Sequence, residues 1–168
     1  QMVVVPSAMS GETNRLLGLA KELAPGKPGA DYYREQDMLA ATGEQASSAL
    51  LAIALQAEGQ PAVSYAGWQV PIKTSNAYTK ARIDSIDDKR VRADLDGGKV
   101  VIITGFQGVD AEGNITTLGR GGSDTTGVAL AGFILAAGLL TIAAPWLMQV
   151  PALHGVLSAL GCQPLQSR

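Results

Sequence analysis

The chain has 168 residues, of which 46% are hydrophobic and 17% are charged, and its formal net charge is −2. This length fits one domain with a sizeable core. The Lys and Arg residues are scattered, so no basic patch of the kind that binds nucleic acid is expected. A single cysteine, Cys162, excludes an internal disulfide and a cysteine-based zinc site. The single histidine, His154, leaves no histidine-rich site, so we predict no metal centre built by the protein alone.

The first apolar run, Met2 to Val5, predicts a buried strand of a parallel sheet. A loop of small residues follows, and then a helix with leucines along one side. The hydroxyl groups of Ser7, Ser10 and Thr13 gather where that strand ends, which is where open α/β sheets bind ligands. Helix N-caps are an equally open interpretation of these hydroxyl groups.

A second helical tract is predicted from about Tyr32 to Ala57, with an interruption over residues 41–44. Glu44 would then lie at the mouth of an apolar helix. A buried carboxylate is costly without a cationic or N–H partner. The partner of Glu44 could be a helix N-terminus or the amino group of a ligand.

Short apolar runs alternate with helical patterns through the middle of the chain, which implies an α/β fold with a largely parallel sheet. The strongest buried strand is expected at Lys99 to Thr104. The other elements expected there are a strand over 61–65, loops or a β-excursion over 67–83, a helix with a charged, solvated face over 83–95, a glycine turn over 105–108, and a hairpin-type turn over 110–114 that leads into a strand ending at Leu118.

A glycine-rich turn, residues 118–127, connects that strand to an Ala/Leu-rich segment that predicts a helix from Val128. Strand, glycine turn and helix start together aim backbone N–H groups at an anion. Arg120 adds a planar fork suited to a carboxylate or a phosphate. Asp124 stands where a helix N-cap would be, which is the structural alternative. The combination favours an anion or substrate site over a plain turn.

The end of the chain differs in composition, because no Asp, Glu, Lys or Arg occurs from Thr125 to Ser167. Residues 131–148 form an uncharged apolar run that is long enough to span a membrane. From composition alone, a membrane span and a buried helix are equally open. At the other end, no signal peptide is evident, and the absence of Met at position 1 predicts that the natural beginning is missing.

Four segments resemble motifs of the aspartokinase family, in the family's order and spacing. The resemblance extends from Val3 to about Leu130, roughly three quarters of the chain. The matching segments are Val3 to Thr13 (with its Ser-Ala-Met loop), Ala41-Thr42-Gly43-Glu44, Gly105-Phe106-Gln107-Gly108, and Thr116 to Thr126 around Leu118-Gly119-Arg120-Gly121-Gly122-Ser123-Asp124.

The resemblance implies an amino-acid-kinase fold, which is a three-layer αβα sandwich with a mainly parallel sheet. It implies transfer of the γ-phosphoryl group of ATP to the β-carboxylate of L-aspartate, with Mg²⁺, in a cytoplasmic enzyme that forms a homodimer. By the same resemblance, the substrate-binding turn includes Gly121, Gly122 and Ser123. Arg120 would clamp a substrate carboxylate, and Glu44 would hold the α-ammonium group. Ser7 and Thr13 would hydrogen-bond the substrate. Asp124 would organise the catalytic centre.

The sequence also departs from the family pattern. It contains neither the family's first Lys-Phe-Gly-Gly-Thr loop, whose lysine contacts ATP, nor the nucleotide-binding segment that follows the matched part. We therefore expect residues 1–130 to be the aspartate-binding part of a truncated aspartokinase domain, and residues 131–168 to be an apolar tail. Two alternatives are a non-catalytic chain or pseudo-enzyme, anchored to a membrane through residues 131–148, and a kinase of the same fold that acts on another carboxylate or a carbamate.

Overall fold

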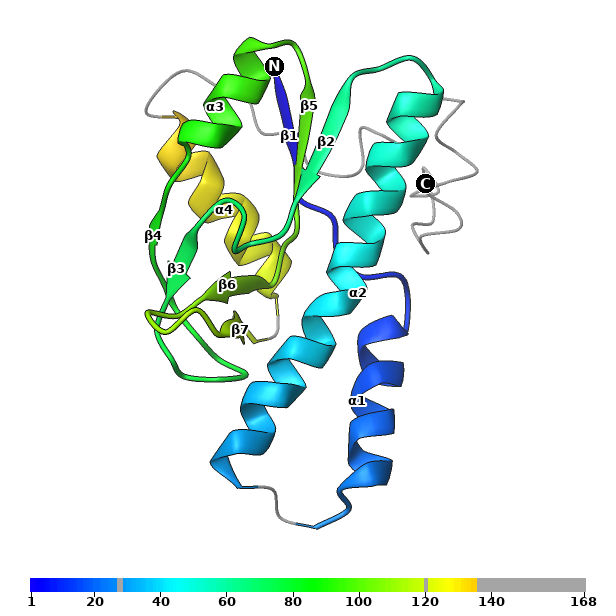
Figure 1. Ribbon diagram of the computed structural model, residues 1–168, viewed down its shortest axis with the longest axis vertical. Coiled ribbons are helices and arrows are strands. Elements are labelled where there is room, and N and C mark those ends of the chain that lie inside the picture. The colour runs from blue at the N-terminus through cyan, green and yellow to red at the C-terminus, as the bar shows by residue number, and fades with distance from the viewer. Residues whose placement is uncertain (27–28, 120, 136–168) are drawn as a thin grey trace, which may run out of the picture.

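The computed structural model describes residues 1–26, 29–119 and 121–135 (Figure 1). Arg120, Cys162 and His154 lie outside the described residues, as does most of the apolar run 131–148. The elements in chain order are β1 (Met2–Val4), α1 (Glu12–Leu23), α2 (Ala30–Ala57), β2 (Ala62–Tyr65), β3 (Ile72–Thr74), β4 (Ile83–Ile86), α3 (Lys89–Asp96), β5 (Val100–Ile103), β6 (Gln107–Val109), β7 (Ile115–Thr117) and α4 (Gly122–Leu135).

The central sheet has three parallel strands in the order β1-β5-β2. Val101 of β5 pairs with Val3 on one side and with Val63 on the other. All four residues of β5 are buried, as expected for the middle strand of a sheet that is covered on both faces. The strand predicted over Lys99 to Thr104 is therefore confirmed as the centre of the sheet.

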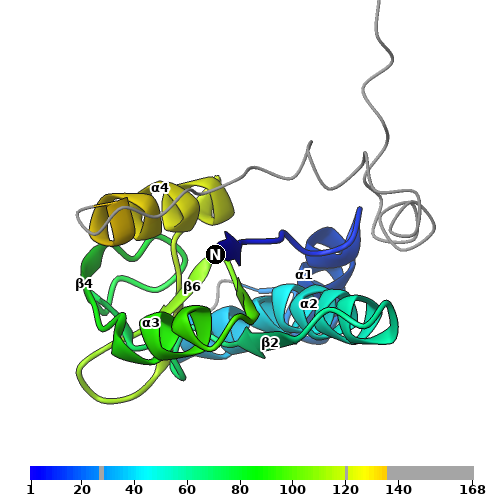
Figure 2. The ribbon, with the colours of Figure 1, turned by 90° about the horizontal axis from the view of Figure 1, so that it is seen from above.

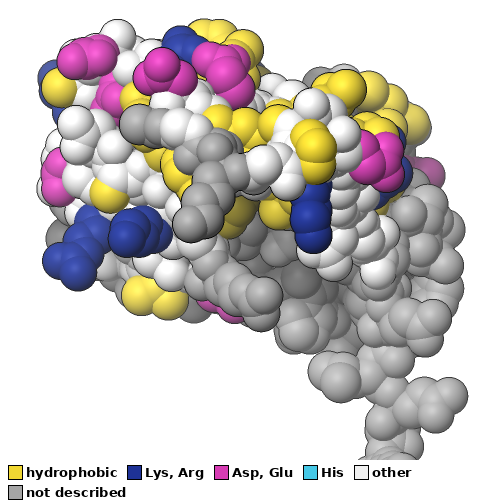
Figure 3. All heavy atoms as spheres, turned by 90° about the horizontal axis from the view of Figure 1, so that it is seen from below, with side chains coloured by type: hydrophobic (Ala, Val, Ile, Leu, Met, Phe, Trp, Pro, Cys, Tyr) yellow, Lys and Arg dark blue, Asp and Glu magenta, His cyan; other side chains and the backbone are white. Residues whose placement is uncertain are grey.

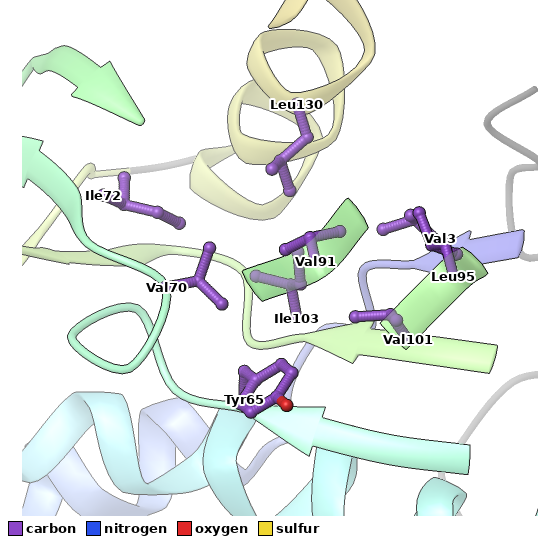
Figure 4. Packing of buried hydrophobic residues seen from close by; sticks show 9 residues of the cluster. All are labelled: Val3, Tyr65, Val70, Ile72, Val91, Leu95, Val101, Ile103 and Leu130. Atoms are coloured by element: carbon purple, nitrogen blue, oxygen red, sulfur yellow. The ribbon is translucent and has the colours of Figure 1, made fainter. Parts of the chain in front are cut away.

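Alternate residues of β5 face two different helical layers, because side chains alternate along a strand. Val101 and Ile103 belong to a cluster that includes Leu95 of α3 and Leu130 of α4 (Figure 4). Val100 and Ile102 belong to a second cluster with residues of α2. In Figure 2, α3 and α4 lie on one side of the sheet, and α1 and α2 lie on the other. The three-layer αβα arrangement is therefore confirmed.

A second sheet, in the order β4-β3-β6-β7, lies beside the first. Its β6–β7 hairpin is antiparallel, and the turn is held by Asp110, whose Oδ1 accepts hydrogen bonds from the N–H groups of Glu112 (3.0 Å) and Asn114 (2.8 Å). Gly113 has the positive φ of 85° that the turn requires. The predicted hairpin-type turn is confirmed. β7 packs on α2, which brings the start of the glycine-rich turn to this helix.

α2 is continuous, so the predicted interruption over residues 41–44 is wrong. Thr42 stays within the helix by donating its hydroxyl to the carbonyl of Leu39 at 2.7 Å. Gly43 does not break the helix. Its lack of a side chain allows close packing, since a Cβ there would lie 3.1 Å from the Cβ of Ala8 and 3.7 Å from Leu16. Glu44 consequently lies in the middle of a helix and not at its mouth.

By length and composition alone, α2 could cross a membrane, since an 18-residue window within residues 31–57 has a mean hydropathy of 1.3. The core helices of soluble proteins meet the same criterion, and α2 packs against β2, β7 and α1. Leu51 and Ala52 are buried within the second core cluster. These contacts identify α2 as a core helix of the αβα sandwich.

The helix predicted over residues 83–95 is only partly correct, because Ile83–Ile86 is strand β4. Both isoleucines pack against the core from this strand, which pairs with β3 across an irregular register. The helix begins after Asp88, where the Asp87 carboxylate accepts a hydrogen bond from the N–H of Lys89 at 3.2 Å. Tertiary pairing of the two β-branched residues thus outweighs the helical spacing of the charges.

Candidate functional site

A pocket of about 580 Å³ opens at the carboxyl ends of β1 and β5. Parallel strands bring these ends to one edge of the sheet, where open α/β folds bind ligands. The loop after β1, the start of α1, the middle of α2 and the β7–α4 turn all contribute to the wall. The described residues that the sequence predicted for a substrate site all line it: Ser7, Thr13, Glu44, Gly121, Gly122, Ser123 and Asp124. Arg120 lies outside the described residues.

Glu44 is a buried carboxyl group with an unused acceptor. Its side chain is 4% exposed, and within the described part of the chain its Oε2 has no hydrogen-bond partner. Burial raises the pKa of Glu44 from 4.5 to about 7, and the backbone N–H groups of Glu44 and Ala8 offset only part of this effect. A cation placed at Oε2 would satisfy the oxygen and favour the ionised form. The pocket is therefore suited to an amino group at this point.

The loop before α1 leaves its hydroxyl groups available to a ligand. The N-cap of α1 is Gly11, with a φ of 77° and no side-chain cap. The N-cap interpretation of Ser7, Ser10 and Thr13 is therefore wrong for this helix. All three line the pocket, and none of them hydrogen-bonds through its side chain to another described residue.

The glycine-rich turn is pressed onto the end of β5. Gly119 and Gly121 have φ values of 78° and 74°, which glycine adopts most readily. A Cβ on Gly122 would lie 2.7 Å from the ring of Phe106, and one on Gly105 would lie 2.7 Å from the Cβ of Ser123. The glycines thus permit contacts that a larger residue would prevent, and α4 starts directly at the pocket.

Asp124 lies in the first turn of α4, and not at its N-cap, because the helix already begins at Gly122. The carboxylate is exposed, and near a helix N-terminus a negative charge is stabilised by the helix dipole. Asp124 lines the first pocket and also a second one of about 560 Å³, to which Arg82, Leu118 and Val128 contribute. Asp124 is therefore shared by the walls of both pockets.

Two features of the site were not foreseen from the sequence. Phe106 lines the pocket with a φ of 68°, a conformation that costs a residue with a side chain about 1–3 kcal/mol. The position of Phe106 in the Gly105–Gly108 turn is the sequence feature that could have indicated this conformation. Asp37 is 1% exposed and holds the strand that leads into the glycine-rich turn. Its partners are distant in sequence, so no local pattern could reveal them.

The charged residues that line the pocket in the described part of the chain are Glu44 and Asp124, both acidic. On the face shown in Figure 3, acidic and basic side chains both occur, with apolar side chains between them. Over the described ranges 1–26, 29–119 and 121–135, no group of three or more His, Cys, Asp or Glu side chains could hold a metal ion. The polar groups that the described residues offer to the pocket are the carboxyl groups of Glu44 and Asp124, hydroxyl groups and backbone N–H groups.

Known proteins share both the sequence and the fold. The profile of the amino acid kinase family matches residues 1–143. Over 130 residues the chain is 62% identical to an aspartate kinase of Pseudomonas fluorescens (strain SBW25) and 62% identical to an aspartokinase of Pseudomonas aeruginosa. These matches cover 77% of this chain, and the chain spans 31% of the length of each relative.

Solved structures of aspartate kinases have a similar fold. A crystal structure of aspartate kinase from Synechocystis matches with a TM-score of 0.59 and 47% identity, over 77% of this chain and 20% of that one. E. coli aspartokinase III in complex with aspartate and ADP matches with a TM-score of 0.71 and 25% identity, over 84% of this chain and 42% of that one. The resemblance to aspartokinases is thus confirmed in sequence and in fold. The chain belongs to the amino acid kinase family.

Proposed function

We propose that this chain contains the aspartate-binding part of an aspartokinase, and that it serves the transfer of a phosphoryl group from ATP to the β-carboxylate of L-aspartate. The observation that supports the proposal is the pocket that combines the turn at the start of α4 with Glu44, whose buried Oε2 has no hydrogen-bond partner among the described residues. The relatives named aspartate kinase, and the solved complex with aspartate and ADP, support the same assignment.

In this proposal Glu44 accepts hydrogen bonds from the α-ammonium group of L-aspartate, which gives its Oε2 a partner that the described residues do not supply. Ser7 and Thr13 donate or accept hydrogen bonds along the substrate. Gly121, Gly122 and Ser123, together with Arg120, bind a carboxylate through N–H groups, a hydroxyl group and the guanidinium fork. Phosphoryl transfer between two oxygens depends mainly on such positioning and charge stabilisation.

The residues present also fit part of a nucleotide site. ATP would supply the phosphoryl group and Mg²⁺ would neutralise charge on its oxygens. Asp124 is an exposed carboxylate between the two pockets, and Mg²⁺ in such sites is held by one or two carboxylates together with substrate phosphates. We assign Asp124 the role of organising the reacting groups there, and the second pocket to the nucleotide side.

The wider assignments belong to the same proposal. Residues 1–130 form the aspartate-binding part and residues 131–168 an apolar tail, in a cytoplasmic protein that forms a homodimer. A purified chain with the mass of two copies in light scattering, recovered without detergent, is the expected outcome. A chain that requires detergent would favour membrane anchoring through residues 131–148.

The function is tested by titrating L-aspartate into the chain and by trapping aspartyl phosphate as its hydroxamate in the presence of ATP and Mg²⁺. We expect calorimetric binding of L-aspartate that Glu44→Gln weakens strongly without abolishing it, and that Glu58→Gln, an exposed change at the end of the same helix, leaves intact. Hydroxamate formation would show turnover by this chain. Binding without turnover would support a non-catalytic chain with an aspartate site.

The ligand selectivity of the chain tests the remaining alternative, which is a kinase of this fold that acts on another carboxylate or a carbamate. L-Glutamate and carbamate are compared with L-aspartate in the same titration. Preference for either of them would favour a kinase of this fold with another acceptor. Absence of binding by L-aspartate would overturn the proposed function.

A further inference from the structure

Asp37 is a buried carboxylate that bridges segments far apart in the chain. It lies on α2, about two turns before Glu44, and is 1% exposed. Both of its oxygens accept a hydrogen bond from the N–H of Thr79, at 3.0 and 2.9 Å. Its Oδ2 also accepts from the N–H of Thr117 at 2.7 Å, and its Oδ1 accepts from the Thr117 hydroxyl at 2.7 Å. One side chain thus connects α2, the loop at Thr79 and the end of β7.

These partners stand directly beside the glycine-rich turn. Thr117 is the last residue of β7, and its carbonyl accepts a hydrogen bond from the N–H of Ala81 at 2.8 Å. Thr79 has a φ of 67°, and its carbonyl oxygen lies 3.2 Å from where a Cβ on Gly119 would stand. The loop therefore abuts Gly119, and the bonds to Asp37 hold both the loop and the strand.

Among the described residues, the partners of the Asp37 carboxylate are N–H and hydroxyl donors and not cations. Burial raises the pKa of Asp37, and the opposing effects come from its hydrogen bonds with Thr79 and Thr117. An apolar side chain would leave the two backbone N–H groups buried without an acceptor, which is costly. The side chain therefore provides a geometric link, and its chemistry requires only an acceptor that serves three donors.

We propose that Asp37 is a positioning residue, which sets the place of Glu44 relative to the turn at the start of α4. Both walls of the pocket depend on this link: α2 carries Glu44 on one side, and β7 leads through Gly119 to residues 121–124 on the other. The identity of the ligand used in the test rests on the proposed function. The link itself is read from the hydrogen bonds.

The geometry predicts which substitutions keep the link. In Asp37→Asn, the amide oxygen at the place of Oδ2 can accept from both backbone N–H groups, and the amide nitrogen can donate to the Thr117 hydroxyl, which then acts as acceptor. Asp37→Ala removes every acceptor. Thr117→Val removes only the hydroxyl group, so it weakens the link while leaving both backbone hydrogen bonds in place.

The test compares these variants with Leu95→Ala, a buried change in α3 that reduces stability without facing the pocket. L-Aspartate is titrated at a temperature at which each variant is folded. We expect Asp37→Ala to raise the dissociation constant by about ten- to a hundredfold, the range that small misplacements in active sites produce. We expect Asp37→Asn and Leu95→Ala to stay close to the unsubstituted chain. If Asp37→Ala does not fold, Thr117→Val replaces it, with a smaller expected increase.

A coupling measurement separates positioning from general destabilisation. In a Glu44→Gln background the Asp37→Ala substitution should weaken the remaining ligand affinity much less than it does alone, because its effect passes through the placement of Glu44. Fully additive effects would overturn the proposal. So would a Leu95→Ala variant that loses as much affinity as Asp37→Ala.

Amide hydrogen exchange tests the link without any ligand. Asp37→Ala should accelerate exchange of the Gly122 and Thr125 N–H groups, which are hydrogen-bonded to the carbonyls of Gly119 and Gly121, by about tenfold or more relative to Leu95→Ala, since the turn loses its attachment to α2. Equal exchange rates would overturn the proposal. A chain that binds no L-aspartate would refute the proposed function, and the exchange rates would still decide the role of Asp37.

Discussion

Replacing Glu44 with glutamine should make the ligand-free chain more stable at alkaline pH. The pKa of Glu44 is raised from 4.5 to about 7 in the folded chain, chiefly by burial. Between these two pH values the folded chain holds a proton that the unfolded chain has lost. Stability therefore falls as the pH rises through this window, and it levels off above the folded pKa.

The size of the effect follows from the shift. At about 1.4 kcal/mol per unit of pKa, the shift of Glu44 corresponds to at most about 3 kcal/mol between pH 4.5 and pH 8. Solvent at the pocket screens the charge, so we expect a loss of folding free energy of at least about 2 kcal/mol. For a chain of this length, that difference corresponds to roughly 4–12 °C in melting temperature.

The assay is urea unfolding of the chain and of Glu44→Gln, followed by circular dichroism across this pH range. The two should be most similar in stability at the acidic end of this range, where Glu44 is protonated in the folded chain and about half protonated in the unfolded chain, and they should diverge as the pH rises. Glu58→Gln, an exposed change on the same helix, provides the matched control. Parallel stability curves for the chain and Glu44→Gln would refute the assignment of a raised pKa to this buried group.

Further predictions concern the ligand and the packing. Binding of L-aspartate at pH 7 should release protons, because a cation beside Glu44 favours the ionised form; calorimetry in buffers of different ionisation enthalpy measures this, and identical enthalpies would contradict it. Gly105→Ala should destabilise the chain by about 1–3 kcal/mol, since its Cβ would lie 2.7 Å from the side chain of Ser123 in the first turn of α4. Gly18→Ala, with open space around it in α1, should instead stabilise by about 0.5–1 kcal/mol, and thermal melts compare the pair. Thr74→Val should cost about 1–3 kcal/mol by breaking the buried hydroxyl pair with Thr116, whereas replacing both threonines with valine should cost less in urea unfolding.

Local patterns in the sequence were sufficient for the centre of the fold. The β-branched run of β5 predicted a buried strand, and the glycine-rich turn predicted a helix start, which lies at the wall of the pocket. These features are determined within a few residues of the chain. The residues predicted for the substrate site gather around one pocket, and their individual roles stay predictions.

The predictions that were wrong or incomplete share one physical cause, which is contact between segments that are far apart in the sequence. Gly43 resembles a helix breaker in the sequence, but it remains helical because it makes room for Ala8. Ile83 and Ile86 fit a helical pattern, but pairing with β3 selects a strand. The hydrogen bonds that Asp37 accepts come from Thr79 and Thr117, which lie far from it in the sequence. No single window of sequence contains these interactions.

The continuity of α2 makes the site sensitive to the number of residues in the helix. Its 28 residues span about 42 Å as a single rigid rod, with Leu51 and Leu55 fixed in the core toward one end and Asp37 and Glu44 toward the other. Deleting one residue between Glu44 and Leu51 would rotate the polar side chains by about 100° relative to the anchored leucines and withdraw them by about 1.5 Å. The helix could still form after such a deletion, but the carboxylates and the buried Ala40 and Ala41 would face the wrong neighbours. Changes in length should therefore be tolerated in the loop before α2 and excluded from the stretch between Glu44 and Leu51.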